Sequence, residues 1–138
     1  MKARTRISLH VSDKKPCIGD KVSFSGYLQA YDSELKRWDP LKGKLTLVID
    51  GEKVKTFSSN NYGYFEVEYK FYVPKKYDVE VRYNGSPKTK ACSASIKIEA
   101  LTEKQKNRIK KIVRLFTLLV ILMLILISLI FILFSFKP

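Results

Sequence analysis

The segment YFEVEYKFYV, residues 64–73, alternates between apolar and charged or polar side chains along most of its length. Phe65 and Val67 fall on one side of an extended chain, and Glu66 and Glu68 fall on the other. Successive side chains of a β-strand point to opposite faces, so a period of two predicts a strand with one face in a core and one in water. This segment therefore predicts a β fold.

The same alternation recurs on both sides of this segment. We expect strands at residues 7–11, 21–30, 45–49, 53–57, 64–73, 77–83 and 93–99. Asp50-Gly51 and Asn84-Gly85 are typical of two-residue hairpin turns, which need positive φ at both positions. Gly26, inside the second strand, indicates a β-bulge. Short strands with one apolar face each predict an all-β sandwich of immunoglobulin-like class, with about seven strands in two stacked sheets.

Three longer segments carry a family resemblance. They are GDKVSFSGYL (19–28), PLKGKLTLVIDGEKVKTFSSNNYGYFEVEY (40–69) and YDVEVRYNGS (77–86). Together they resemble the Ig-like modules that are common in archaeal and bacterial surface proteins, and the match covers about residues 7–99. The resemblance implies an Ig-like sandwich that acts as a spacer, adhesive unit or linker, without a shared active site. The chain differs from the usual pattern in having one module and in lacking a visible export signal at its N-terminus.

The segment LFTLLVILMLILISLIFILFSF, residues 115–136, contains no charged residue, no Pro and no Gly. A helix of 22 residues is about 33 Å long, which is enough for a hydrocarbon core of about 30 Å. The segment therefore predicts a single transmembrane helix, followed by a short tail at residues 137–138. The expected organisation is a head at residues 1–100, a basic stem at 101–114 and the span at 115–136.

The stem contains six of the cations that raise the net charge to +13. They are Lys104, Lys106, Arg108, Lys110, Lys111 and Arg114. TEKQ (102–105) matches a capping box, which predicts that a helix begins at Glu103. A basic flank favours the cytoplasmic side of a membrane, and each cation near anionic lipid headgroups contributes about 1 kcal/mol of binding. We therefore expect a cytoplasmic head and stem contacts with lipid headgroups, with an exterior head as the alternative.

Residue types that carry catalysis or bind metals are scarce. Cys17, Cys92 and a single histidine, His10, are too few for a zinc site. If the first and last strands are parallel neighbours, the two cysteines lie at opposite ends of the sandwich as free thiols. His10 falls on the polar face of an early strand. We expect no catalytic residue, metal or cofactor, and an enzyme on a β-sandwich remains only a minor alternative.

Aromatic residues outside the expected core are the candidate partner contacts. Tyr31, Arg37 and Trp38 lie in YDSELKRWDP (31–40), the longest expected loop, and Tyr62 and Tyr64 lie at loop or outward positions. Exposed Trp, Tyr and Arg residues are favoured anchors in protein interfaces. The alternative is that the loop packs on its own sandwich. Without a cluster of arginines or a stacking platform, nucleic-acid binding is not expected.

These features favour one general function. We expect a non-catalytic single-pass membrane protein whose Ig-like head is a protein-interaction or scaffolding module. Its partner would be an unidentified protein or membrane complex of which it is an accessory subunit. The alternative is a structural or adhesive protein of a cell surface or viral envelope, with the head outside.

Overall fold

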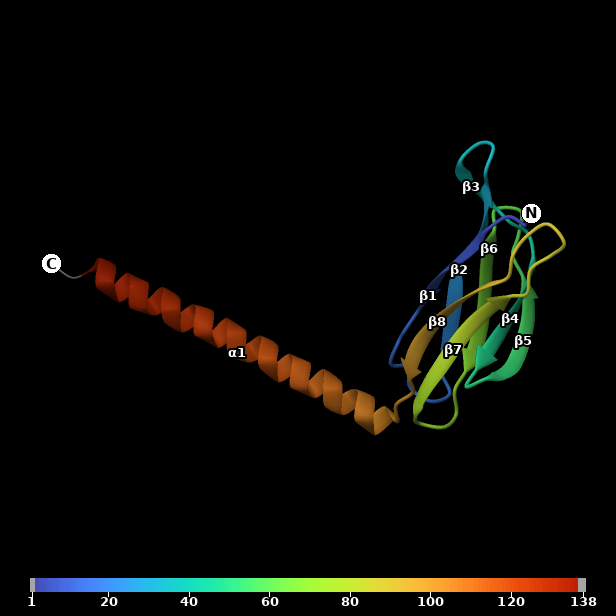
Figure 1. Ribbon diagram of the computed structural model, residues 1–138. Coiled ribbons are helices and arrows are strands. Elements are labelled where there is room, and N and C mark those ends of the chain that lie inside the picture. Colours follow the sequence, from blue (N-terminus) through green and yellow to red (C-terminus); the bar gives the residue numbers. More distant parts are fainter. Residues whose placement is uncertain (1, 137–138) are drawn as a thin grey trace. The chain divides into compact units, whose positions relative to one another are not determined.

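A computed structural model describes residues 2–136 and divides the chain into two compact units between Thr102 and Glu103. The first unit is a β domain and the second is a single long helix (Figure 1). The expected tail at residues 137–138 lies outside the described residues. The mostly β head and the long apolar C-terminal helix are both confirmed.

The β domain contains eight strands in two antiparallel sheets of four strands each. The strands are β1 (Thr5–Val11), β2 (Lys21–Asp32), β3 (Arg37–Pro40), β4 (Lys44–Ile49), β5 (Glu52–Ser58), β6 (Tyr64–Lys70), β7 (Lys76–Tyr83) and β8 (Cys92–Glu99). In the first sheet, the long strand β2 pairs with β1 along one edge and with both β6 and β3 along the other. The order in the second sheet is β5-β4-β7-β8.

One hydrophobic core joins the two sheets. The residues of this core follow the alternation in the sequence. Val22, Phe24 and Leu28 of β2 are buried, whereas Ser23 and Ser25 are only partly buried. The second sheet supplies facing side chains from β4, β7 and β8, namely Leu45, Leu47, Ile49, Val79, Val81, Tyr83 and Ile98. Each sheet thus covers the apolar face of the other, as stacking of two half-apolar sheets requires.

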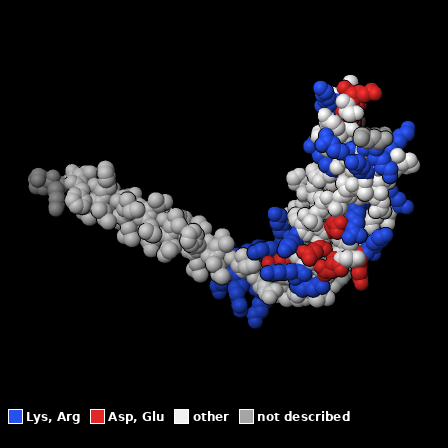
Figure 2. All heavy atoms as spheres, in the orientation of Figure 1, with Lys and Arg blue, Asp and Glu red and all other residues white. Residues whose placement is uncertain are grey.

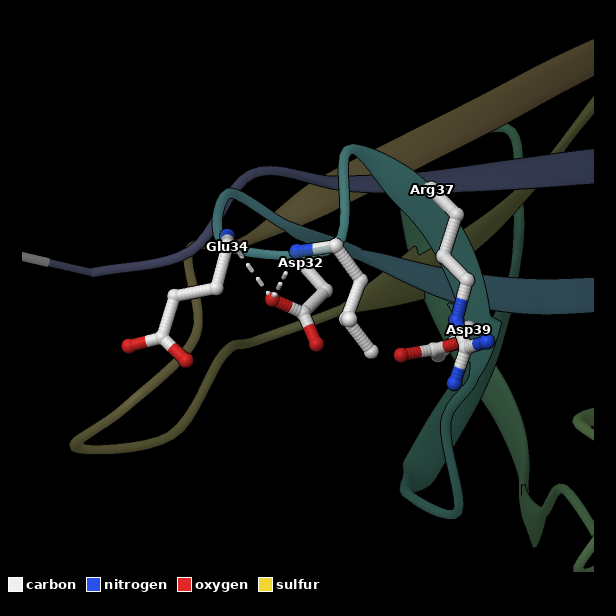
Figure 3. A network of polar contacts seen from close by, with 5 residues as sticks. Asp32, Glu34, Arg37 and Asp39 are labelled. Carbon is white, nitrogen blue, oxygen red and sulfur yellow. Dashed lines mark hydrogen bonds and ion pairs between the residues drawn. The ribbon is translucent and has the colours of Figure 1, made fainter.

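The segment at residues 31–40 is a β-hairpin, so its assignment to a loop was wrong. The end of β2 pairs with β3, and Tyr31 lies opposite Trp38. At the tip, Asp32 Oδ1 accepts hydrogen bonds from the backbone N–H groups of Glu34 and Leu35 (Figure 3). This Asx-type turn ends β2, and the four residues of β3 are too few to show a period of two.

Gly26 does not form the expected bulge. The register of β2 with β1 and with β6 is unbroken through this residue, and the irregularity lies between Leu47 and Val48, opposite β5. A Cβ atom at Gly26 would lie 1.8 Å from the backbone oxygen of Ser8. The glycine therefore allows the close approach of β1 to β2.

The two cysteines lie at opposite ends of the β domain. Cys17 forms a parallel bridge with Leu101, beyond the end of β8, whereas Cys92 begins β8 opposite Tyr83. Nine residues of extended chain span about 30 Å, which is far beyond the reach of a disulfide. Both thiols are free, as the strand arrangement predicted. Partial burial raises the pKa of the Cys92 thiol.

The helix α1 (Glu103–Ser135) begins where the capping box predicted. Among the described residues it is the one helix that is long and apolar enough to cross a membrane, with a mean hydropathy of 3.3 in its most apolar window. None of its side chains is buried within the protein. The hydroxyls of Thr117, Ser128 and Ser135 donate to backbone carbonyls one turn earlier, which satisfies them inside the helix.

The compact β unit ends at Thr102, two residues past the expected boundary at residue 100, and its last residues are tied to the domain. Ala100 is 2% exposed and Leu101 is 6% exposed. Their backbone N–H groups donate to Lys75 O at 3.0 Å and to Pro16 O at 2.8 Å. These residues close the core before α1 begins, and the core cluster contains no residue of the helix.

We therefore predict that residues 1–102, produced without α1, unfold cooperatively in urea. A shorter fragment, residues 1–99, should lose about 2–4 kcal/mol of unfolding free energy, because it lacks one buried leucine and its hydrogen bonds. Urea denaturation followed by far-UV circular dichroism measures both. Non-cooperative unfolding of residues 1–102 with dye-binding apolar surface would contradict the prediction.

Candidate functional site

Aromatic side chains gather on the outer face of the first sheet. Tyr27 of β2 lies opposite Tyr64 of β6, with ring centroids 5.5 Å apart and ring planes at 61°. Tyr31 of β2 lies opposite Trp38 of β3, with centroids 5.3 Å apart at 58°. Tyr27 and Tyr31 are four residues apart in one strand and therefore share a face, opposite to the face that carries buried Leu28.

Two arginines of the N-terminal segment stack on these rings. The Arg4 guanidinium lies 4.7 Å from the centroid of Tyr31, and that of Arg6 lies 4.1 Å from the centroid of Trp38. Arg6 Nε also donates a hydrogen bond of 2.8 Å to Gln29 Oε1. The two distances from guanidinium to ring centroid fall within the range of cation–π attraction. We call the set Arg4, Arg6, Tyr27, Tyr31, Trp38 and Tyr64 the aromatic–arginine surface.

The structure brings together three of the five candidate partner contacts, Tyr31, Trp38 and Tyr64. Arg37 is not part of this surface, because it forms an ion pair of 2.8 Å with Asp39 (Figure 3). Tyr62 is 78% exposed at the tip of the loop between β5 and β6, outside the stacked pairs. Trp38 is half-buried under Arg6 and Tyr31, and it packs outside the hydrophobic core.

Sequence reasoning missed Arg4 and Arg6, and it left Tyr27 out of the candidate contacts although alternation places Tyr27 on the outward face. Their positions carry one local signal, since Arg6 and Tyr27 both alternate with inward-facing residues of their strands. The pairing of β1 with β2 then brings Arg6 opposite Gln29, and that register is not readable from either segment alone.

The aromatic–arginine surface lies toward one end of the β domain. That end also carries the N-terminal segment from Lys2, the β2–β3 hairpin and the loop between β7 and β8 (Figure 1). Strand β8 begins here at Cys92 and runs to Glu99 at the opposite end, where the chain leaves the domain after Thr102. We call the first the far end and the second the exit end.

The carboxyl groups with shifted pKa values belong to surface ion pairs away from this surface. Lys75 lies 2.8 Å from Asp50 and lowers the pKa of that carboxyl, and Arg82, 2.7 Å from Glu80, does the same for Glu80. These shifts arise from pairing with a cation. Within residues 2–136, no three His, Cys, Asp or Glu side chains are grouped so as to hold a metal. Stacking and hydrogen bonding from guanidinium groups are thus the chemistry that the surface offers.

The six candidate membrane-surface cations all lie in the first part of α1, from Lys104 to Arg114. Five are exposed and Lys106 is partly buried. The helix that begins at Glu103 continues without a break from these cations into the apolar segment. The basic and apolar parts therefore form one uninterrupted helix.

By class, the protein is a two-layer β domain followed by one helix that is long and apolar enough to cross a membrane. No family model matches the chain. It is similar to an uncharacterized protein of Archaeoglobus fulgidus, with 30% identity over 112 residues that make up 80% of this chain and 77% of the relative. The chain belongs to the same family as that archaeal protein. The match is longer than the β domain and so includes part of α1.

The packing of Trp38 on the outer face leads to a stability prediction. Trp38→Ala in residues 1–102 should lower the unfolding free energy by about 1–2 kcal/mol, because it removes one ring pair and one cation–π contact. Phe24→Ala, which empties a core position, should cost about 3–5 kcal/mol. Urea denaturation compares the two variants. Equal losses would mean that Trp38 acts as a core residue.

Proposed function

We propose that the chain is a non-catalytic, membrane-anchored protein whose head docks a protein partner through the aromatic–arginine surface. In this role it is an accessory or scaffolding subunit of a membrane-associated complex. The observation that carries the proposal is the clustering of one tryptophan, three tyrosines and two arginines on one outward face.

The composition and the order of this surface both favour protein recognition. Trp, Tyr and Arg are the residue types that contribute most to binding energy in protein interfaces. Tyr31 and Trp38 are already stacked on each other and on arginines, so docking would cost little side-chain entropy.

An Ig-like head fits this role. The two antiparallel sheets with one shared core agree with the expected sandwich, and the segments that resemble Ig-like modules supply β2, β4 to β6 and β7. Modules of that kind have no common active site, so their function depends on the surface that each one displays.

The helix α1 supports membrane anchoring. The apolar side chains from Leu115 to Phe136 are exposed in the protein. A surface of that size is stable in lipid and would aggregate in water. The cations from Lys104 to Arg114 would then lie near the lipid headgroups, where anionic lipids attract them.

The positive charge of the stem favours a cytoplasmic head. The second candidate places the head outside the cell or on a viral envelope, as an adhesive or structural module. The resemblance to modules of surface proteins favours this second candidate.

Docking through Trp38 can be tested by affinity purification of the full chain from its native membranes in mild detergent. Trp38→Ala should release the copurifying protein, because loss of an interface anchor typically costs at least about 2 kcal/mol of binding. The matched control is Tyr72→Ala, an aromatic residue that is 70% exposed near the exit end. Retention of the partner by Trp38→Ala, or equal loss in both variants, would refute docking through this surface.

Orientation can be tested by protease protection in inside-out membrane vesicles. Protease added outside should digest the wild-type head. Changing Lys104, Lys106, Lys110 and Lys111 to Gln, with lysines added after Pro138, should protect a fraction of the heads by inverting them. A protected wild-type head would instead support the exterior candidate.

A further inference from the structure

A basic pocket adjoins the aromatic–arginine surface at the far end. It is a shallow cavity of about 370 Å³ lined by Lys2, Arg4, Lys88 and Lys90, together with Tyr31 and Ser33. The described residues that line it include no carboxylate. Figure 2 shows blue Lys and Arg atoms gathered over this end of the head.

Backbone pairing places the four cations side by side. Ala3 and Thr89 form a parallel bridge, in which Ala3 N donates to Lys88 O at 2.9 Å and Lys90 N donates to Ala3 O at 2.8 Å. Lys2 and Arg4 flank one bridged residue, and Lys88 and Lys90 flank the other. All four side chains line the same cavity.

A buried threonine holds the loop that carries Lys88 and Lys90. Thr89 is 8% exposed, and its Oγ1 lies 2.7 Å from the Tyr83 hydroxyl and 2.5 Å from Ser86 Oγ. Because Thr89 is fixed inward, the two lysines on either side of it are held outward. The pocket is thus built by the fold.

The four cations are electrostatically unbalanced. Among residues 2–136, none of them forms an ion pair, whereas Lys21, Arg37, Lys75 and Arg82 do. Like charges held side by side repel one another, and an anion bound between them would remove this cost. The arrangement is therefore complementary to a ligand with several negative charges.

We propose that the basic pocket binds a cluster of Asp or Glu side chains on the protein partner that docks on the aromatic–arginine surface. This inference rests on the proposed function. Arg4 and Tyr31 belong to both regions, so one partner segment can place carboxylates in the pocket and apolar side chains on the rings. Such a segment also explains why both regions lie at the same end of the head.

A peptide fits better than a nucleic acid. Binding of successive bases needs a groove with open aromatic faces along it. Here arginines already cover one face of Tyr31 and of Trp38, and the cavity is a single site. A few carboxylate groups, by contrast, need only the four cations that line this cavity.

The test measures binding of a fluorescein-labelled hexaglutamate peptide to the full chain in detergent micelles, by fluorescence anisotropy at low salt. The peptide should bind, and added salt should weaken binding, because exposed ion pairs are screened. Lys88→Gln with Lys90→Gln should weaken binding about fivefold or more. The matched control is Lys14→Gln with Lys15→Gln at the exit end, which removes the same charge and should change affinity by less than about twofold.

Absence of peptide binding, or equal weakening by both variants, would overturn the proposal. Tighter binding of a single-stranded oligonucleotide that is lost on changing Lys88 and Lys90 would also overturn it, in favour of nucleic acid. The proposed function fails separately, through partner retention by Trp38→Ala. If hexaglutamate does not bind while partner capture still depends on Trp38, only the assignment of the pocket is wrong.

Discussion

Burial of one apolar sheet face against another is the interaction on which the β domain depends. Strand β2 shows this dependence most directly, because it pairs with three strands and contributes to both faces of its sheet. Its even-numbered residues Phe24 and Leu28 lie in the core, and its odd-numbered residues Tyr27 and Tyr31 carry the outer aromatic pairs. A shift of register by one residue would exchange these two sets. The core therefore also determines which side chains are available for binding.

The two ends of the β domain are closed in different ways. At the exit end, Ala100 and Leu101 are buried before α1 begins. The backbone N–H of Ala100 donates a hydrogen bond to the loop before β7, and that of Leu101 donates one to the loop after β1. At the far end, the bridge between Ala3 and Thr89 ties the N-terminal segment to the loop after β7. Both closures use backbone hydrogen bonds, and the first also buries apolar side chains. Charged side chains gather at both ends, but those at the exit end include Asp78 and Glu99, whereas those that line the basic pocket are all cations.

The proposed role as an anchored binding module assigns a separate task to each of the two units. The helix supplies an apolar segment with a basic beginning, and the β domain carries its aromatic–arginine surface away from the point where the chain leaves it. A partner held at the far end would not compete with lipid for the same side chains. The similarity to the archaeal relative covers 80% of this chain, which is more than the β domain alone.

The sequence by itself determined the elements whose signals are local. Alternation predicted seven of the strands and the core positions of β2, although β6 ends at Lys70, earlier than expected. The apolar run predicted the helix, and the capping box predicted its start at Glu103. Strand β3 was missed because a four-residue strand shows no period. Tertiary structure alone decided that Gly26 serves a close strand approach, that Arg6 covers Trp38, and that Lys2 meets Lys88. Each of these contacts joins residues far apart in the chain. They depend on strand pairing across the sheets, and no local pattern of side chains encodes which strands will be neighbours.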